Sequence, residues 1–176
     1  MPIKIHNVEQ GTKEWHELRK LYPHTGSVAH NLLRHGTKDY PRNDSKFTGN
    51  FYTRRGHALE PEAIEVYEAI KDVKVDRFGF ITNSKFPGCG YSPDGSTDRI
   101  IEVKAFNEKR HKEVSNNVPL EIQAQVQFGM MIMEMKLADL ILYNPEIDAE
   151  DCLFIITIKR NNKIIDNFKR ILYGEK

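Results

Sequence analysis

The sequence predicts a single α/β or α+β domain over residues 1–176, with a mixed central β-sheet flanked by helices. Its 176 residues, 39% hydrophobic and 29% charged, are typical of one globular domain with its own core. Helical patterns begin and end the chain, and strand-like runs interrupted by one helix lie between them. This order favours helices packed on the faces of a sheet.

The first 36 residues predict two short helices after an extended start. Thr12 is a suitable N-cap for a helix over 13–21. Trp15 and Leu18 follow helical spacing in this stretch, and we interpret both as core residues. A Tyr-Pro pair ends the helix, and a second helix is expected over 25–36, where a glycine terminates it.

A polar segment and a longer helix follow. Residues 35–50 are rich in turn-forming residues and predict a mobile surface loop. Helical spacing returns from 51 to about 72, with Pro61 inside the pattern. Because an interior proline kinks a helix or marks the first turn of a new one, we expect Glu60 near a helix boundary.

The remainder of the chain predicts a sheet interrupted by a helix and closed by another. The strand-like runs are 73–76, 78–83, the stretch leading to Gly90-Tyr91-Ser92, 99–106, 137–144 and 152–160. A basic polar segment, 107–117, and a helix over about 119–135 lie between the runs 99–106 and 137–144. Residues 162–176 have an apolar face and predict the final helix.

Several classes of protein are excluded by composition. No apolar run approaches the roughly 20 residues that span a bilayer, and the N-terminal residues do not resemble a signal peptide. The two cysteines are isolated, which excludes a zinc or iron-sulfur cluster built on cysteines. We therefore expect a soluble protein of a reducing, cytoplasmic compartment.

The net charge of +1 conceals an asymmetry along the chain. Residues 1–56 carry ten Lys/Arg against five Asp/Glu, a net of +5, whereas 57–100 sum to −3 and 101–176 to −1. A basic lobe beside an acidic one is typical of an enzyme that binds a polyanion on one side and cations at its centre. Uneven scatter of ordinary surface charge is the alternative.

Opposite charges share one face of a predicted strand within GYSPDGSTDRIIEVKAF, residues 90–106. Because side chains alternate along a strand, Glu102 and Lys104 point the same way and their neighbours enter the core. Asp94 lies in a Pro-Asp-Gly turn signal, which predicts a hairpin that brings it close to Glu102.

This arrangement has two interpretations. Adjacent carboxylates repel unless one is protonated or a cation joins them, and oxygen ligands without His or Cys favour Mg²⁺ or Mn²⁺. Lys104 could then orient or deprotonate a water molecule. The alternative is a turn aspartate beside an ordinary ion pair. Glu60 is a candidate third carboxylate, or else a solvated helix residue.

Six segments occur in order over most of the chain: EQGTKEWHELR, TGSVAHNLL, RRGHALEPEA, GYSPDG, IIEVKAF and QAQVQFGM. Together they resemble the lambda-type phage exonucleases, also called YqaJ-like viral recombinase nucleases, within the PD-(D/E)XK superfamily. The resemblance implies a restriction-endonuclease-like core with a mixed sheet.

The resemblance also implies roles for the charged residues. Asp94, Glu102, Glu60 and the main-chain carbonyl of Val103 become metal ligands, and Lys104 becomes the catalytic lysine. The implied cofactor is Mg²⁺, with Mn²⁺ as a substitute and two ions in each site.

A pocket for the 5′ phosphate of a DNA end is implied at Arg19, Ser27, Ser92 and Gln125. Arginine can clamp a phosphate through two parallel hydrogen bonds, and Ser27 is predicted at a helix N-terminus, where free amides favour an anion. Gln125 belongs to a glutamine-rich stretch of the 119–135 helix. These glutamines form either one polar face or part of a groove floor.

The function implied by the resemblance is that of a Mg²⁺-dependent deoxyribonuclease. It would digest double-stranded DNA from 5′ to 3′ and leave 3′ overhangs for phage-type recombination, in a phage or prophage protein. Implied partners are DNA ends, a single-strand annealing protein and copies of itself in a trimer, although the chain is short for the family. The alternatives are a structure-specific or nicking endonuclease of the same superfamily, a DNA-end-binding module with a vestigial site, and a domain that binds no nucleic acid.

Overall fold

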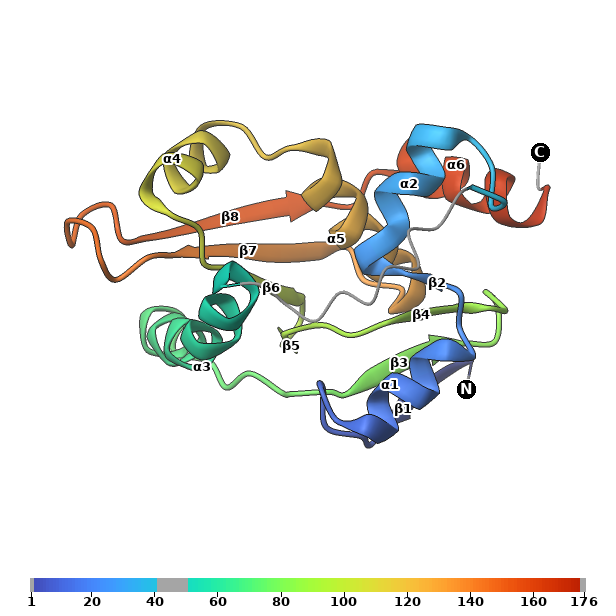
Figure 1. The fold of residues 1–176 in the computed structure, drawn as a ribbon, viewed down its shortest axis with the longest axis horizontal. Helices are drawn as coiled ribbons and strands as arrows, with labels where there is room; N and C mark the ends of the chain where they lie inside the picture. The colour runs from blue at the N-terminus through green and yellow to red at the C-terminus, as the bar shows by residue number, and fades with distance from the viewer. Residues whose placement is uncertain (1, 41–50, 175–176) are drawn as a thin grey trace.

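Two four-stranded sheets with helices on their faces make up the fold (Figure 1). The computed structural model describes residues 2–40 and 51–174. The first sheet has the order β1-β3-β4-β2, with β1 Ile3–His6, β2 His24–Thr25, β3 Phe80–Asn83 and β4 Cys89–Tyr91. The second has the order β5-β6-β7-β8, with β5 Gly95–Ser96, β6 Ile100–Lys104, β7 Leu137–Tyr143 and β8 Leu153–Lys159. Both sheets combine parallel and antiparallel pairs, which confirms the predicted mixed α/β fold. The strands form two sheets, however, and not the single central sheet that was predicted.

Six α-helices and one 3₁₀ turn are present in the described part of the chain. They are α1 Lys13–Lys20, the 3₁₀ turn Gly26–Val28, α2 Ala29–His35, α3 Phe51–Lys71, α4 Glu108–Asn116, α5 Leu120–Ile132 and α6 Asn162–Tyr173. The side chain of Thr12 caps α1 by accepting a hydrogen bond from the Trp15 amide, as predicted. None of the helices described is long and apolar enough to cross a membrane.

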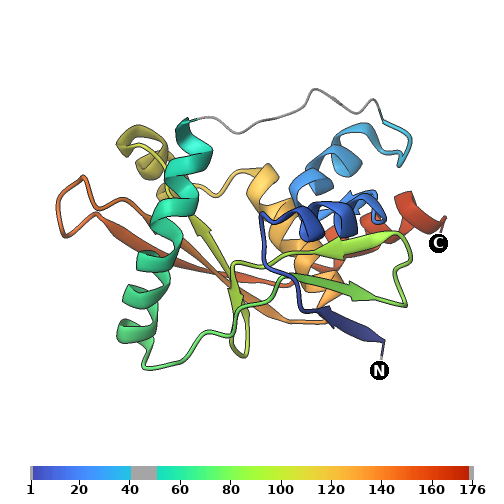
Figure 2. The same ribbon diagram turned by 60° about the horizontal axis from the view of Figure 1, so that its bottom comes forward.

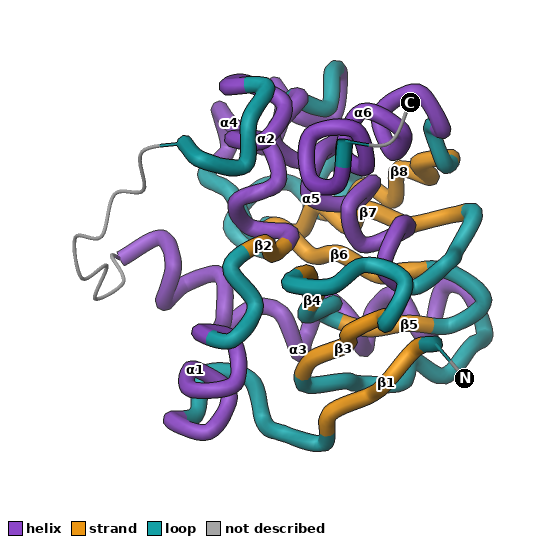
Figure 3. Tube along the Cα trace, turned by 90° about the vertical axis from the view of Figure 1, so that its right-hand side faces the viewer, coloured by secondary structure: helices purple, strands orange, loops and turns teal. Residues whose placement is uncertain are grey.

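The second sheet is covered on both faces. Apolar residues of α3 pack on one face, where Ile101 and Val103 of β6 contact the helix cluster that contains Tyr67. On the other face α5 contacts β6 and β7, and it also contacts β3 and β4 of the first sheet. Figure 2 shows α3 along its side of the sheet, and Figure 3 shows β6, β7 and β8 of the second sheet above β1 and β3 of the first. Helix α5 therefore joins the two sheets, and α3 is anchored on the second.

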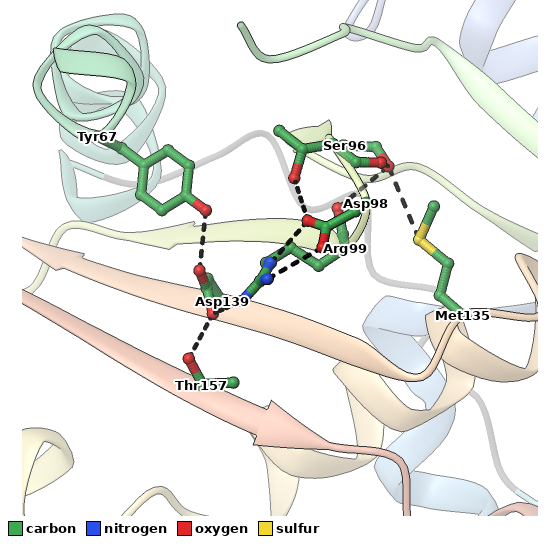
Figure 4. Close-up of polar contacts among 8 residues, drawn as sticks. Tyr67, Ser96, Asp98, Arg99, Met135, Asp139 and Thr157 are labelled. Atoms are coloured by element: carbon green, nitrogen blue, oxygen red, sulfur yellow. Dashed lines mark hydrogen bonds and ion pairs between the residues drawn. The ribbon is translucent and has the colours of Figure 1, made fainter. Parts of the chain in front are cut away.

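A buried carboxylate on β7 ties α3 to the second sheet. Asp139 is fully buried and accepts hydrogen bonds from Tyr67 of α3 at 2.8 Å and from Thr157 of β8 at 2.7 Å. Arg99, in the turn between β5 and β6, lies 3.5 Å from the same carboxylate and also pairs with exposed Asp98 (Figure 4). A buried charge persists because it is paired and hydrogen-bonded, so this network holds four segments in one arrangement.

Several local predictions were wrong. The basic segment 107–117 contains helix α4, with Asn107 as its N-cap, because His111 and Val114 are buried against the rest of the fold. Residues 73–76 form no strand and contribute only an isolated bridge from Asp76 to Ser96.

The predictions for the N-terminal half also need correction. The second helix starts later than expected, because 24–25 form β2 and Gly26–Val28 form a 3₁₀ turn. Helix α3 continues through Pro61, so Glu60 lies in mid-helix and not at a boundary. Of the predicted loop 35–50, residues 41–50 lie outside the described part of the chain.

Candidate active site

The centre of the candidate site is one face of β6. Glu102 is 1% exposed, and Lys104 places its Nζ 2.6 Å from Glu102 Oε1. The intervening Val103 and the preceding Ile101 are buried on the opposite face, against α3. The predicted alternation is therefore present, and the two charges face the α5 side of the sheet.

Asp94 lies beside Glu102, although the turn differs from the predicted one. The hairpin between β5 and β6 turns at residues 97–99, and Asp94 precedes β5. Gly95 pairs with Ile101, so the next position along the pair sets Asp94 opposite Glu102. Asp94 Oδ2 accepts a hydrogen bond from the Val103 amide at 2.7 Å. Since the N–H and C=O of one strand residue point to the same edge, the Val103 carbonyl also lies on the Asp94 side.

Two uncharged side chains complete the surroundings of Glu102. The Tyr91 hydroxyl donates to Glu102 Oε2 at 2.8 Å, and Gln125 Nε2 donates to Oε1. The tyrosine ring fits between Gly26 and Gly129, where added Cβ atoms would lie 2.6 and 2.5 Å from ring carbons. Sequence reasoning missed Tyr91. Its only local signal is an aromatic residue two positions before the Pro-Asp-Gly segment.

Burial and mutual repulsion dominate the electrostatics of the site. Burial and the charge of Glu102 raise the pKa of Asp94 well above its usual range. Burial acts to lower the pKa of Lys104, but the carboxylates of Glu102 and Asp94 outweigh it, and the pKa is raised. Burial and Glu102 likewise raise the pKa of Tyr91, so its hydroxyl stays a donor. An added cation would relieve the repulsion between Asp94 and Glu102.

Glu60 reaches the site from α3 but is bound elsewhere. Its Oε1 accepts a hydrogen bond from Arg77 Nη1 at 2.9 Å, and His57 Nδ1 lies 4.0 Å from Oε2. Burial raises the pKa of Glu60 against the opposing effects of these two cationic groups, with a further contribution from Glu102. Among the described residues, no three His, Cys, Asp or Glu side chains gather closely enough to hold a metal ion.

The donors around β6 nevertheless fit a hard cation. Asp94 and Glu102 supply carboxylate oxygens, and Val103 supplies a carbonyl on the same edge of the strand. Oxygen donors of this kind suit Mg²⁺ or Mn²⁺, and two facing carboxylates need a cation to remain ionised together. Arg77 occupies Oε1 of Glu60, the further carboxylate that could join this set.

A separate cavity of about 320 Å³ brings together two of the predicted phosphate ligands. Its lining residues are Arg19, Lys20, Tyr22, Pro23, Thr25, Ser27 and Val28. Arg19 Nη2 lies 3.0 Å from Ser27 Oγ and 3.3 Å from Thr25 Oγ1, so a guanidinium and two hydroxyls converge. Sequence reasoning placed Thr25 at the start of the second helix and missed it as a residue of this cavity.

Ser92 and Gln125, the other two predicted phosphate ligands, do not line this cavity. Ser92 Oγ donates to the Gly79 carbonyl at 2.8 Å and accepts from Trp15 Nε1 at 3.0 Å. The Trp15 ring lies 4.2 Å below the Arg19 guanidinium, so Ser92 supports the cavity through Trp15 and does not line it. Gln125 binds Glu102 instead.

Two further sequence interpretations change with these contacts. Gln123 and Gln127 donate to the carbonyls of Val118 and Lys159, so the three glutamines of α5 do not form one polar face. Trp15 and Leu18 are only half-buried and are not core residues, because α1 lies at the surface.

Comparisons with known proteins identify the family and the fold. The YqaJ-like viral recombinase domain matches residues 14–136, a span that contains every candidate site residue. LHK-Exo in complex with dAMP has a TM-score of 0.80 and 22% identity, covering 93% of this chain and 90% of that one. The alkaline exonuclease LHK-Exo from Laribacter hongkongensis has a TM-score of 0.78 and 23% identity, with the same coverage of both chains. A phage-related exonuclease from Haemophilus somnus 129PT has a TM-score of 0.58 and 17% identity, covering 94% of this chain and 85% of that one. No curated protein sequence matches the chain.

Proposed function

This chain belongs to the YqaJ-like viral recombinase domain family, and from that premise we propose that it is a Mg²⁺-dependent deoxyribonuclease. We propose further that it digests duplex DNA from a 5′ end and leaves a 3′ single strand for recombination. The observation that carries the proposal is the grouping of Asp94, buried Glu102 and Lys104 at β6 and the start of β5, with the amide of Val103 bound to Asp94.

The metal ligands in this proposal are Asp94, Glu102 and the carbonyl of Val103, with Glu60 as an additional ligand. When bound, Mg²⁺ offsets the charge of the phosphate and acidifies water. Tyr91 and Gln125 hold Glu102 in place through both of its oxygens. The family resemblance adds the expectation of two ions in each site and of Mn²⁺ as a substitute.

Lys104 carries the proton chemistry in this proposal. Its ammonium group is held at Glu102, and its side chain is 24% exposed, so it can reach both the site and solvent. It orients the attacking water by donating hydrogen bonds, and it accepts the proton of this water after giving up its own proton to solvent. As the water oxygen bonds to phosphorus and the P–O3′ bond breaks, the proton of the water passes to Lys104, the 3′ oxygen takes up a proton from solvent, and a 5′ phosphate results.

The Arg19 cavity is proposed as the site of the terminal 5′ phosphate. The guanidinium of Arg19 and the hydroxyls of Ser27 and Thr25 offer donors that suit a phosphate. The related LHK-Exo was solved with dAMP, a nucleotide that carries a phosphate. A phosphate held here would keep the end of the strand bound between successive cleavages.

The test of catalysis compares three DNA substrates in Mg²⁺: linear duplex with 5′-phosphate ends, linear duplex with 5′-hydroxyl ends, and a closed circle. We expect degradation of the linear duplexes only, and a loss of about 10²- to 10⁴-fold in Lys104→Ala. Lys109→Ala, which removes an exposed lysine of α4, is the matched control. Cleavage of the circle would favour the endonuclease alternative, and binding without cleavage would favour the end-binding module.

The test of the cavity is Arg19→Ala, with exposed Arg34→Ala as its control. We expect Arg19→Ala to lose the preference for phosphorylated ends and Arg34→Ala to keep it. An unchanged preference in Arg19→Ala would remove the cavity from the proposal. A homotrimer and an annealing partner remain expectations from the family resemblance, to be tested by sedimentation and by co-purification.

A further inference from the structure

Arg77 is a cation beside the candidate active site that the proposed mechanism does not use. Its side chain is 46% exposed, and its Nη1 lies 2.9 Å from Glu60 Oε1. The residue follows α3 in the connection to β3, and it is 17 positions away from Glu60 in sequence. The pair is therefore a tertiary contact and not a pairing within one helix.

The backbone around Arg77 is fixed alongside the strand that carries Asp94. Hydrogen bonds join the backbone of residues 76–79 to its neighbours. They are Asp76 N to Ser96 O and Ser96 N to Asp76 O, both 2.9 Å, Gln10 Nε2 to Phe78 O, and Trp15 Nε1 and Ser92 Oγ to Gly79 O. Segment 76–79 thus runs antiparallel to 92–96, and this register sets Arg77 opposite Gly95, the residue after Asp94. A guanidinium held at this position lies at the rim of the carboxylate site.

The guanidinium of Arg77 occupies one oxygen of Glu60, Oε1. Arg77 is the close cationic partner of Glu60, since His57 Nδ1 is 4.0 Å from Oε2 and the His57 side chain is 76% exposed. Glu60 also belongs to no three-residue cluster of metal-binding side chains in the described residues. A divalent cation bound at Glu60 would lie beside the guanidinium charge and compete with it for Oε1, so cation binding would weaken the bond to Arg77.

We propose that Arg77 and the cation compete for Glu60, and that cation binding releases Arg77 to bind a DNA phosphate. This inference rests on the proposed function. The released side chain is about half exposed and carries five donors in a planar fork that matches phosphate oxygens. Its segment also ends at Gly79, which binds Ser92 and Trp15 beneath the Arg19 cavity. Arg77 thus lies on the chain segment between the two places where phosphates are expected.

The first test is calorimetric titration with Mn²⁺ in the absence of DNA. Arg77→Gln is expected to bind Mn²⁺ about two- to fivefold more tightly than wild type, the factor that corresponds to an exposed ion pair. Lys74→Gln is the matched control, because Lys74 pairs with Glu68 of the same helix at 2.8 Å, and Glu68 is no candidate ligand. Both variants lose one positive charge, so a greater effect of Arg77→Gln isolates the competition. Equal or weaker Mn²⁺ binding by Arg77→Gln, relative to Lys74→Gln, would overturn the inference.

The second test is duplex binding measured by fluorescence anisotropy over a range of salt concentrations, in EDTA and in Ca²⁺. In EDTA we expect Arg77→Gln to match wild type, because Arg77 is held by Glu60. In Ca²⁺ we expect the variant to bind more weakly, with the slope of log K against log salt reduced by about one phosphate contact. Arg77→Lys is expected to restore the slope. Identical slopes for wild type and Arg77→Gln in Ca²⁺ would refute the release.

The two proposals fail differently in these experiments. A wild-type protein that neither binds Mn²⁺ nor cleaves DNA contradicts the proposed function. A wild-type protein that does both, with Arg77→Gln indistinguishable from Lys74→Gln, contradicts only the role of Arg77.

Discussion

Gly129→Ala offers a sharp test of how the site is held together. Gly129 is buried inside α5, and a Cβ at this position would lie 2.5 Å from Tyr91 Cζ. Gly26 lies at the opposite edge of the ring, where its own Cβ position is 2.6 Å from Cε2, so the ring has little space to yield. The hydroxyl on Cζ is the group that donates to Glu102, and any shift of the ring weakens that bond.

The size of the effect follows from three terms. Gly to Ala inside a helix is normally favourable by about 1 kcal/mol. Overpacking of a core costs about 1–3 kcal/mol, and loss of a hydrogen bond to a charged group costs about 1.5–3 kcal/mol. The net expectation is a loss of roughly 2–4 kcal/mol in the free energy of unfolding, which lowers Tm by on the order of 10 °C in a chain of this size.

The matched control is Gly56→Ala in α3, where an added Cβ meets nothing within 4 Å. We expect this variant to gain about 1 kcal/mol and to keep its nuclease activity. Thermal unfolding and the linear-duplex assay report stability and activity side by side. Tyr91→Phe removes the hydroxyl alone, and its effect should not add to that of Gly129→Ala, because both act on one bond. A Tm for Gly129→Ala equal to that of Gly56→Ala would refute the reasoning.

Three other outcomes are expected. Tyr67→Phe and Thr157→Val each remove one hydrogen bond to Asp139, and each should lower the free energy of unfolding in urea by about 1.5–3 kcal/mol. Only Tyr67→Phe should also weaken Mn²⁺ binding, because α3 carries Glu60 and β8 carries no candidate ligand. Equal Mn²⁺ affinities of the two variants would contradict this link. Burial lowers the pKa of His111, so below about pH 6.5 the unfolded chain binds more protons than the folded one and stability falls as the pH drops. His111→Gln should flatten this dependence of the free energy of unfolding on pH, measured by urea titrations. An unchanged pH dependence would exclude His111 as its source. Removal of divalent cations with EDTA should abolish cleavage of linear duplex and added Mg²⁺ should restore it, whereas cleavage that persists in EDTA would exclude the metal-dependent mechanism.

Local patterns predicted some elements well and others badly. The β6 prediction succeeded because a five-residue buried strand shows a clear alternation of charged and apolar residues. The prediction for 107–117 failed because α4 has few apolar residues, and its stability depends on the burial of His111 and Val114 against other elements. The Pro-Asp-Gly signal misplaced the hairpin turn, which lies at 97–99.

The sequence by itself determined the family, the mixed α/β class and the shared face of Glu102 and Lys104, because ordered motifs and the two-residue period of a strand are local properties of the chain. Only the tertiary structure decided what those side chains touch. Tyr91 and Gln125 reach Glu102 from other elements, and Arg77 reaches Glu60 across 17 positions of sequence. Such contacts depend on how helices and strands pack in space, and no spacing along the chain encodes them. For the same physical reason Gln125 lies at Glu102 and not in the Arg19 cavity, where the family resemblance had placed it.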